Sequence, residues 1–481
     1  MSDAGYLGGE EPKRRVRHAH PRGDLTEGPV GKTLLMFTLP TLGANILQSL
    51  NGSISAIYVG KFLGENAFAA AGVAIQVSML VFSSVFGLSM AATIIIGQAM
   101  GRRDMHEVRR TAGAVAGTFI VLGFLISALG EWAAPGILRL LSTPPAAFPF
   151  AVAFLRISFL GLPPLFLMIS LQSALRGVGD AVTPLWSTVL NLTFSILLNP
   201  IFILGLGPFP KMGLAGAALA GVVTNIICLI FIVVRIYWAD LQIRLRGAEW
   251  VLLKPDWDHL KPVLVIGVPM GASMWVMSAS MFVMTGLINR EGVETVAAYN
   301  AINQVFSYIQ MPAFAVGSAV SAMAAQNIGA GRWDRISLIA RTGVLTNCAI
   351  TGVLVAAVLL AGPLLLAIFL PHGSPAIAIG QHINLMIGWT FIPMGISMVM
   401  TSIVRANGAV AGPFLILVFS VLVVRMAVGF ALYPTFRADA IWWSFMASGS
   451  SSAILGVLYY LQGGWRRGAH AIARRAAVPA E

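Results

Sequence analysis

The sequence predicts an all-α integral membrane protein with twelve transmembrane helices, arranged as two six-helix lobes related by a parallel internal repeat. Three observations lead to this fold class: an apolar composition, a series of long charge-free windows, and a motif pattern that occurs twice. Of the 481 residues, 57% are hydrophobic and only 10% are charged, whereas a soluble chain is roughly 25% charged. The composition therefore excludes an ordinary soluble protein.

The first charge-free window, residues 33–60, sets the pattern for the rest of the chain. It is longer than the ~20 residues that cross the hydrocarbon layer of a membrane. Pro40 lies inside it and predicts a bend, because proline removes one backbone hydrogen bond of a helix. Gln48, Asn51 and Ser55 follow at helical spacing. We expect this polar stripe to face protein or a water-filled cavity, because lipid cannot satisfy it.

Further windows without charge divide the chain into twelve predicted helices. The first helix is expected at about 33–59, a long second helix follows it, and the third and fourth are expected at about 112–141 and 148–175. The two cysteines lie in apolar spans and indicate no disulfide or metal site. We predict the following organisation: a basic tail at 1–31, read as disordered, a six-helix lobe at 32–238, a linker with an interfacial helical piece at 239–261, a second six-helix lobe at 262–464, and a basic tail at 465–481.

The net charge of +12 is interpreted as a topology signal rather than as a sign of nucleic-acid binding. With twelve spans, most basic residues fall on one side, including Arg102 and Arg103 after the second helix and Arg332 and Arg335 after the eighth. Because lysine and arginine accumulate in cytoplasmic loops, both termini are predicted to be cytoplasmic in a multi-pass protein of the cell (inner) membrane. Attraction of the tails to anionic lipid is a secondary expectation.

The second half of the chain repeats the first at a nearly constant spacing. Three prolines recur 229 residues later, and a Gln-x-x-Gly motif recurs 228 residues later. Six helices per half is an even number, so both halves enter the membrane in the same direction, with a cavity expected at their interface. The matched positions are Pro40 and Pro269, Pro164 and Pro393, Pro184 and Pro413, and Gln98-x-x-Gly101 and Gln326-x-x-Gly329.

These motifs resemble those of the multidrug and toxic compound extrusion (MATE) family. In the first half the resemblance lies in SLNGSISAIYVGKFLGENAFAAAGVA, IIIGQAMGRR and LQSALRGVGDAVTP, and in the second half in AAYNAINQVFSYIQMP, AQNIGAGRWDR and IVRANGAVAGP. It covers about residues 30–465. The resemblance implies two six-helix lobes around a central cleft and antiport of organic compounds against H⁺ or Na⁺.

The sequence departs from this family where the family usually carries membrane-embedded acids. In the family, such acids occur at the positions that correspond here to Ser55 in the first helix, to Asn199 before a proline in the fifth, and to the neighbourhood of Met277 in the seventh, and one occurs in the tenth. None of the nineteen acidic residues lies deep in a predicted span. The coupling ion is thus left open among H⁺ carried by His382, Na⁺ held by neutral oxygens, and no coupling at all.

The candidate binding residues are polar or apolar stripes on the predicted helices. Single amides and hydroxyls of this kind also serve as helix–helix contacts worth ~0.6 kcal/mol each, and that alternative stays open for each residue. For the two N-terminal stripes together we favour a cavity lining. The candidates are Gln48, Asn51, Ser55, Thr188, Asn191, Ser195 and Asn199 in the first lobe, and Trp275, Met277, Tyr299, Asn300, Asn303 and Gln304 in the second.

Two ionisable residues are expected inside the second lobe. Arg425 falls near the middle of the eleventh helix, where a lone charge costs at least ~2.5 kcal/mol, so it should face the bundle interior. We include it among the substrate or ion ligands. His382 is the possible proton carrier, since histidine titrates near neutrality, and a structural histidine is the alternative.

The sequence favours a MATE-like secondary exporter that works by alternating access. The alternatives from other classes are a flippase for lipid-linked intermediates, which Arg425 would suit, and a receptor or scaffold without transport. We expect no enzymatic activity, no cofactor and no metal site. The expected partners are a small organic substrate and membrane lipid, without nucleic acid, and the protein is expected to be a monomer.

Overall fold

The computed structural model describes residues 23–141, 143–145, 147–206, 210–371 and 373–467. All regular elements in these ranges are helical. Of the predicted tails at 1–31 and 465–481, residues 1–22 and 468–481 lie outside them. The elements are α1 (Val30–Gly101), α2 (Met105–Leu140), α3 (Phe148–Leu160), α4 (Leu162–Gly177), α5 (Val182–Leu204), α6 (Leu214–Trp238), η1 (Gly247–Leu253), α7 (Trp257–Asn289), α8 (Val293–Gly329), α9 (Trp333–Leu360), α10 (Gly362–Ala367), α11 (Pro375–Ile387), η2 (Gly388–Thr390), α12 (Phe391–Ala406), α13 (Ala411–Val418), η3 (Phe419–Val424), α14 (Arg425–Phe436), α15 (Ala438–Gln462) and η4 (Gly464–Arg467).

The number of membrane-spanning segments confirms the predicted fold class. Eleven helical segments are long and apolar enough to cross a membrane, and the pair α3 and α4, bent by 48°, brings the total to twelve. The helix α1 supplies two of them, a first arm (Val30–Gly64) and a second arm (Ala70–Gly101). Gly64 between the arms has φ of 79°, a left-handed conformation that glycine adopts without the steric penalty of a side chain.

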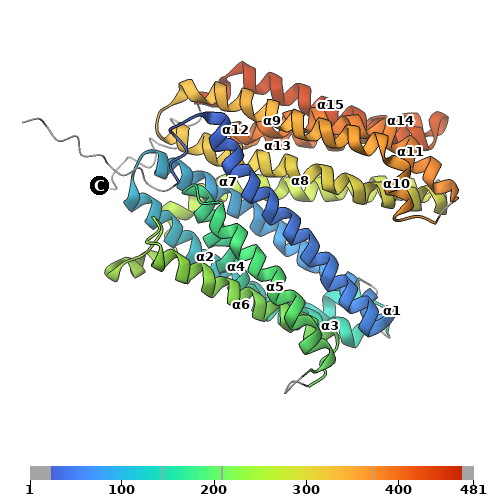
Figure 1. Cartoon of the computed structure of the whole chain (residues 1–481), viewed down its shortest axis with the longest axis horizontal. Coiled ribbons are helices and arrows are strands. Elements are labelled where there is room, and N and C mark those ends of the chain that lie inside the picture. The colour runs from blue at the N-terminus through green and yellow to red at the C-terminus, as the bar shows by residue number, and fades with distance from the viewer. Residues whose placement is uncertain (1–22, 142, 146, 207–209, 372, 468–481) are drawn as a thin grey trace, which may run out of the picture.

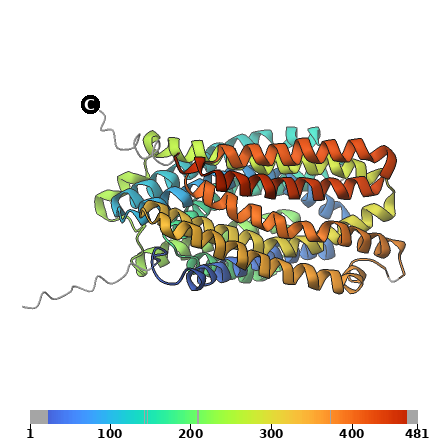
Figure 2. The same ribbon diagram turned by 90° about the horizontal axis from the view of Figure 1, so that it is seen from above.

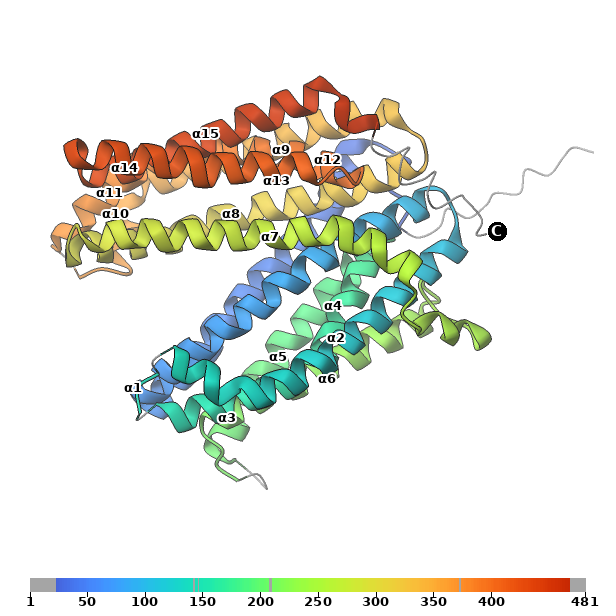
Figure 3. The same ribbon diagram turned by 180° about the vertical axis from the view of Figure 1, so that it is seen from behind.

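The helices form two lobes that diverge like the arms of a V (Figures 1 and 3). One lobe holds α1 to α6 and the other holds α7 to α15. The lobes meet where α1 ends and α9 begins, and they separate toward α3 and α10. Figure 2 shows from above that the helices run along the long axis of the molecule. We call the end where the lobes meet the basic end, because it carries Arg102, Arg103, Arg332 and Arg335.

The two lobes meet along the second arm of α1, which packs on α7 and α8. Gly101 lies against the backbone of Gln326, and Gly329 lies against the backbone of Gln98, so a side chain at either glycine would collide with the facing helix. Close approach of helix backbones through small residues is the usual basis of tight packing in membranes. The repeated Gln-x-x-Gly motif thus forms the interlobe contact itself.

Along α8 and the second arm of α1, residues are buried where the lobes meet and become exposed where the lobes separate. Toward the basic end, α8 is buried continuously from Ser321 to Ile328, whereas in its other half Asn300, Asn303 and Gln304 are exposed. The second arm of α1 behaves alike, with Gln76 exposed and the residues near its end buried. Amide side chains exposed in the half of the molecule where the lobes separate indicate a water-filled space there, because lipid would not satisfy them.

Several local predictions are corrected. Residues 23–29 are not a disordered tail, because they are bound between the lobes, and α1 already begins at Val30. The third span begins at Met105 rather than near 112. The predicted linker at 239–261 does contain a short helical piece, η1, but α7 starts within it at Trp257. A turn of π-helix, η3, interrupts the eleventh span directly before Arg425.

Candidate functional site

In the first lobe, asparagines from three helices form a connected ladder. The Asn51 Nδ2 group of α1 donates to Asn191 Oδ1 of α5 at 2.8 Å, and Asn191 Nδ2 donates to Asn225 Oδ1 of α6 at 3.3 Å. Asn51 Oδ1 is buried and has no hydrogen-bond partner. Two predicted candidates, Asn51 and Asn191, are therefore brought together. Asn225 was not predicted, although its isolation in the apolar run of α6 was a visible signal.

The other residues of the α5 stripe form hydrogen bonds mainly within their own helix. Asn199 Nδ2 donates to Ser195 O at 2.7 Å and to Ser195 Oγ at 3.0 Å, while Thr188 Oγ1 donates to Pro184 O at 3.0 Å. Asn199 is 2% exposed, and its Oδ1 atom lacks a partner. A buried carbonyl oxygen without a donor is costly, so this atom is available to a bound cation or donor group.

The remaining candidates of the first helix are more open. Gln48 is exposed, and Ser55 is half-buried. Tyr58, three residues after Ser55, lies within 3.5 Å of Ile196 O of α5. The stripe as a whole therefore runs from the α1–α5 contact toward the surface.

The second lobe buries a cation in addition to amides such as Asn347 and Asn384. Arg425 is 7% exposed, and its Nε and Nη1 groups donate to Ser448 Oγ at 3.0 Å and Ser280 Oγ at 3.3 Å. Its guanidinium carbon lies 4.5 Å from the ring centre of Phe445. In the described ranges no carboxylate lies within 4 Å of it. The prediction that Arg425 faces the interior agrees with this geometry, and its partners are two hydroxyls and an aromatic ring.

The π-helical turn before Arg425 was not foreseen from the sequence. Such turns insert one extra residue into a helix and are frequent at functional sites. By adding that residue, η3 changes the direction in which the α14 side chains leave the helix axis. Nothing in the apolar stretch FSVLVV distinguishes a π-turn from an α-turn, which explains why the sequence did not reveal it.

The α7 and α8 candidates divide into a buried and an exposed group. Tyr299 is buried and stacks on Trp442, with ring centres 5.8 Å apart. Asn300, Asn303 and Gln304 are exposed. Trp275 is 49% exposed, and Met277 is half-buried. The structure thus joins Tyr299 to the aromatic surroundings of Arg425 and leaves the three amides free to meet a ligand.

His382 lies apart from these interior residues. Its Nε2 atom is 2.8 Å from Asp439 Oδ1, and both side chains are about half exposed. The contact links the middle of α11 to the first turn of α15 and is an ion pair only when the imidazole is protonated. In Figure 1, α11 lies toward the end of the second lobe that is opposite the basic end.

At the basic end, two glutamines hold the lobes together. Gln98 Nε2 of the first lobe donates to Ala406 O of the second at 2.6 Å, and Gln326 Nε2 of the second lobe donates to Gly177 O of the first at 3.0 Å. Each acceptor directly follows one of the repeated arginines, Arg176 and Arg405. These reciprocal bonds follow the internal repeat, and the sequence predicted the repeated motif but not the interlobe contacts that it makes.

Comparison with known proteins identifies the architecture. The model of the MatE family matches residues 40–201 and 269–431. A protein named "Probable multidrug resistance protein YoeA" of Bacillus subtilis is 31% identical over 442 residues, which cover 91% of this chain and 95% of that protein. The "FAD transporter" of Shewanella oneidensis is 24% identical over 315 residues, which cover 65% of this chain and 69% of that protein.

A solved structure described as the outward-facing conformation of a multidrug resistance MATE family transporter matches this chain with a TM-score of 0.83. The two chains are 21% identical, and the match covers 94% of this chain and 98% of the other. That likeness establishes the fold, and the two separate segments matched by the family model coincide with the two lobes. The chain therefore belongs to the MATE family of multidrug efflux transporters, which are multi-pass membrane proteins.

Proposed function

We propose that this protein is a secondary active exporter of small organic compounds that works by alternating access. The single observation that carries the proposal is the arrangement of the lobes. They are sealed at one end by Gln98 and Gln326, and they carry exposed amides where they separate. Two lobes joined at only one end can rock so that a central site opens to alternate sides.

The positive-inside rule gives this arrangement a direction. The closed end carries Arg102, Arg103, Arg332 and Arg335 and is assigned to the cytoplasm, together with both termini. The open end then faces outward. We propose that the lobe of α1 to α6 and the lobe of α7 to α15 are the two moving units, and that one chain is sufficient for transport, because each chain contains both lobes.

The substrate site is proposed to lie between the asparagine ladder of the first lobe and the α7–α8 surface of the second. Asn51, Asn191 and Asn199 offer amide groups and unpartnered oxygens, while Asn300, Asn303 and Gln304 are exposed on α8. Arg425 is a buried cation, and none of the carboxylates that the structure describes lies within 4 Å of it. These groups favour neutral or anionic organic compounds over dications. The existence of a related FAD transporter supports an anionic substrate.

The coupling ion is proposed to be H⁺ or Na⁺, but not through the usual carboxylates, since Ser55 and Asn199 stand at those positions. Sodium prefers oxygen ligands, and the unpartnered Oδ1 atoms of Asn51 and Asn199 are suitable donors. His382 is the alternative proton carrier. Among the described residues, no group of three or more His, Cys, Asp or Glu side chains could hold a metal ion.

The test is export of fluorescent organic compounds by purified protein in liposomes, with the H⁺ gradient and the Na⁺ gradient collapsed in turn. We expect export to fail when the coupling gradient is removed. Labels placed at the open ends of the two lobes should also report two distances between the lobes, one for the outward-open form and one for the inward-open form. A single fixed separation under all gradients and substrates would contradict alternating access.

A lipid-linked intermediate flippase is the second candidate, favoured by Arg425. An arginine that lacks a carboxylate partner is suited to a phosphate group. A flipping assay with fluorescent lipid-linked pyrophosphate, run beside the export assay on the same liposomes, separates the two functions. Flipping without export of soluble compounds would favour the flippase.

A further inference from the structure

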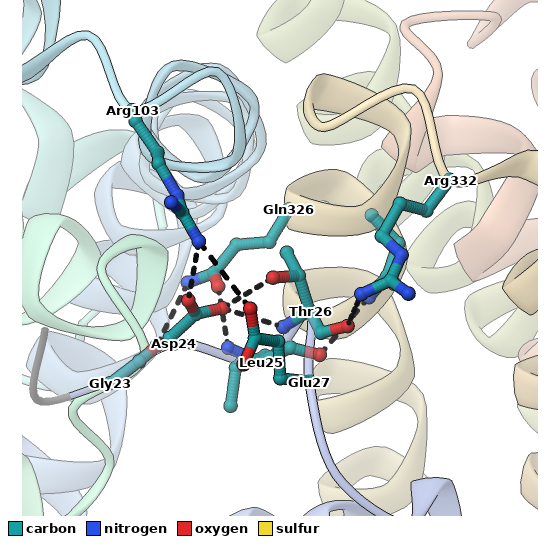
Figure 4. Close-up of polar contacts among 9 residues, drawn as sticks. Gly23, Asp24, Leu25, Thr26, Glu27, Arg103, Gln326 and Arg332 are labelled. Atoms are coloured by element: carbon teal, nitrogen blue, oxygen red, sulfur yellow. Dashed lines mark hydrogen bonds and ion pairs between the residues drawn. The ribbon is translucent and has the colours of Figure 1, made fainter. Parts of the chain in front are cut away.

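A short segment before α1 lies across the seam between the lobes at the basic end (Figure 4). We call residues 23–29 the N-terminal clasp. Leu25 and Thr26 are each only 6% exposed, although they precede the first membrane-spanning helix. A chain segment that precedes a helix is usually solvated unless specific contacts hold it. The burial of the clasp therefore points to a defined binding site for it.

Side chains of the second lobe bind the clasp mostly at backbone groups of the clasp. Leu25 N–H donates to Gln326 Oε1 at 2.9 Å, and Asn327 Nδ2 donates to Leu25 O at 3.1 Å. Farther along, Arg332 Nη1 donates to Thr26 O at 2.8 Å, and Arg335 Nη2 donates to Gly28 O at 2.9 Å. Four side chains of α8 and α9 and of the turn between them thus read the backbone of the clasp.

The first lobe holds the other side of the same segment. Gly23 lies against the backbone of Val178 and Gly179, in the turn that follows α4. Arg103, which follows the second arm of α1, is 3.4 Å from Glu27 and 3.8 Å from Asp24. The clasp therefore contacts both lobes at once.

Gln326 joins the clasp to the interlobe seal. Its Nε2 atom donates to Gly177 O of the first lobe at 3.0 Å and lies 3.3 Å from Gly23 O of the clasp, while its Oε1 atom accepts from Leu25 N–H. The corresponding residue of the first lobe, Gln98, donates to Ala406 O. A single amide of the second lobe thus binds the clasp and the first lobe together.

The internal repeat allows the clasp to be compared with a second segment. A shift of 229 residues places its counterpart at residues 252–258, from the end of η1 to the first turn of α7. There the backbone of Leu252 and Leu253 packs against Gly113 and Gly117 on α2, and Asp256 pairs with Arg110 at 2.9 Å. The counterpart therefore binds α2, which corresponds in the repeat to α9, so both segments cross to the opposite lobe. The clasp differs in its contact with the interlobe glutamine, because Gln326 binds it whereas the side-chain bond of Gln98 is to Ala406.

We propose that the N-terminal clasp is a state-dependent lock on the cytoplasmic gate. It is covalently continuous with α1 and so must travel with the first lobe. When the lobes separate at the basic end, it loses its bonds to Gln326, Asn327, Arg332 and Arg335. Its release is then a required step of inward opening. This inference rests on the proposed alternating access, and the experiment below distinguishes failure of the lock from failure of that cycle.

The lock is tested by distance measurements across the open end, with the full-length protein in lipid nanodiscs. Spin labels replace Leu140 at the end of α2 and Leu360 at the end of α9, which are 85% and 87% exposed. Cys228 and Cys348 are changed to serine in this background. A long distance reports the outward-open form, and a shorter one reports the inward-open form.

Two variants weaken the clasp in different ways. The double variant Arg332→Ala with Arg335→Ala removes two side chains that bind it, and deletion of residues 2–26 removes most of the clasp. The matched control is Arg341→Ala, an exposed arginine of α9 outside the clasp site. Because one hydrogen bond contributes about 1 kcal/mol, we expect the ratio of short to long distances to rise at least about fivefold in both clasp variants and to stay constant in the control.

The possible outcomes separate the two ideas. If the unmodified protein shows both distances but neither clasp variant changes their ratio, the lock is refuted and the transport cycle stands. If the unmodified protein shows one distance under every ion gradient and substrate, the lock and the proposed cycle are both refuted. A rise confined to the clasp variants supports the lock.

Discussion

The two lobes share a helix plan but differ in the chemistry of their interiors. The first lobe is held by the neutral ladder of Asn51, Asn191 and Asn225. The second lobe holds the cation of Arg425 between two serines and Phe445. The residue that precedes Arg425 by 229 positions is Ile196. The duplicated helices therefore do not carry duplicated binding groups.

At the seam, by contrast, the repeat is retained. Gln98 and Gln326 each cross to the opposite lobe and bond a backbone carbonyl at the end of a helix. Because the lobes must pack on each other at this end, both halves are constrained in the same way. The interiors bind ligands or support the helices independently, so they are free to differ. The comparison teaches that the repeat is retained where the lobes contact each other, whereas the polar groups inside the lobes differ.

The largest expected effect comes from replacing the cation of the second lobe. Arg425→Met should reduce export of an anionic dye by roughly 10- to 100-fold, because hydrogen bonds to a charged group contribute about 1.5–3 kcal/mol. The melting temperature should hold or rise, since a buried charge is replaced by an apolar side chain of similar length. Export of anionic and neutral dyes into inside-out vesicles measures the difference.

The control for this prediction is Arg156→Met, which removes an exposed arginine paired with Glu131 at 3.6 Å. It should leave export of both dyes unchanged. If Arg425→Met reduced the export of neutral and anionic dyes equally while lowering the melting temperature, Arg425 would be a structural residue and the contrast between the lobes would lose its functional meaning.

The next effect tests whether the seam is symmetric in energy as well as in geometry. Gln326→Leu loses bonds to Gly177, Gly23 and Leu25, whereas Gln98→Leu loses its bond to Ala406. At about 1 kcal/mol per bond, Gln326→Leu should shift the balance of the two states by about 2–3 kcal/mol and Gln98→Leu by about 1 kcal/mol. Distances between labels at positions 140 and 360 measure both shifts.

Equal shifts in the two glutamine variants would mean that the clasp contributes nothing to closure. A larger shift for Gln98→Leu would reverse the proposed asymmetry. The double variant provides the additional check, because the two glutamines lie at one contact and the difference between its shift and the sum of the single shifts measures their coupling.

The fold was predictable because it depends on averages over many residues. The twelve spans follow from charge-free windows, which the helices of the structure match in length and composition. The clasp could not be predicted, since GDLTEG has the composition of a loop and its order comes from Gln326, about 300 residues away. The η3 turn depends equally on distant packing.

The site was predictable only as residue types on helices. Asn51 and Asn191 were selected from helical spacing and do meet, but spacing within one helix cannot show which neighbour an amide will face. Asn225 was missed for that reason. The direction of Arg425 toward the interior followed from the cost of a charge in lipid, whereas the identity of its partners required the packing of α7 and α15.

A smaller effect is expected in the neutral lobe. Asn191→Leu removes the middle of the ladder and leaves Asn51 and Asn225 without their partner. Hydrogen bonds between membrane helices average about 0.6 kcal/mol, so the loss of two should cost about 1–2 kcal/mol of stability. Thermal unfolding in detergent measures it. Asn51→Leu added to Asn191→Leu should cost little more, because the Asn51 amide would no longer be left unpaired; an additive loss would show that the ladder is not a unit.

The smallest effect is expected at His382, because its partner lies at the surface. Exposed ion pairs contribute about 0–1 kcal/mol, and both His382 and Asp439 are about half exposed. His382→Gln should therefore change the melting temperature little. It should also leave the H⁺ dependence of export intact, because the pair lies apart from the asparagine ladder and from Arg425. Export measured with and without a pH gradient tests this expectation. Loss of the H⁺ dependence with export retained would instead identify His382 as the proton carrier, and the second lobe would then supply the coupling as well as the cation.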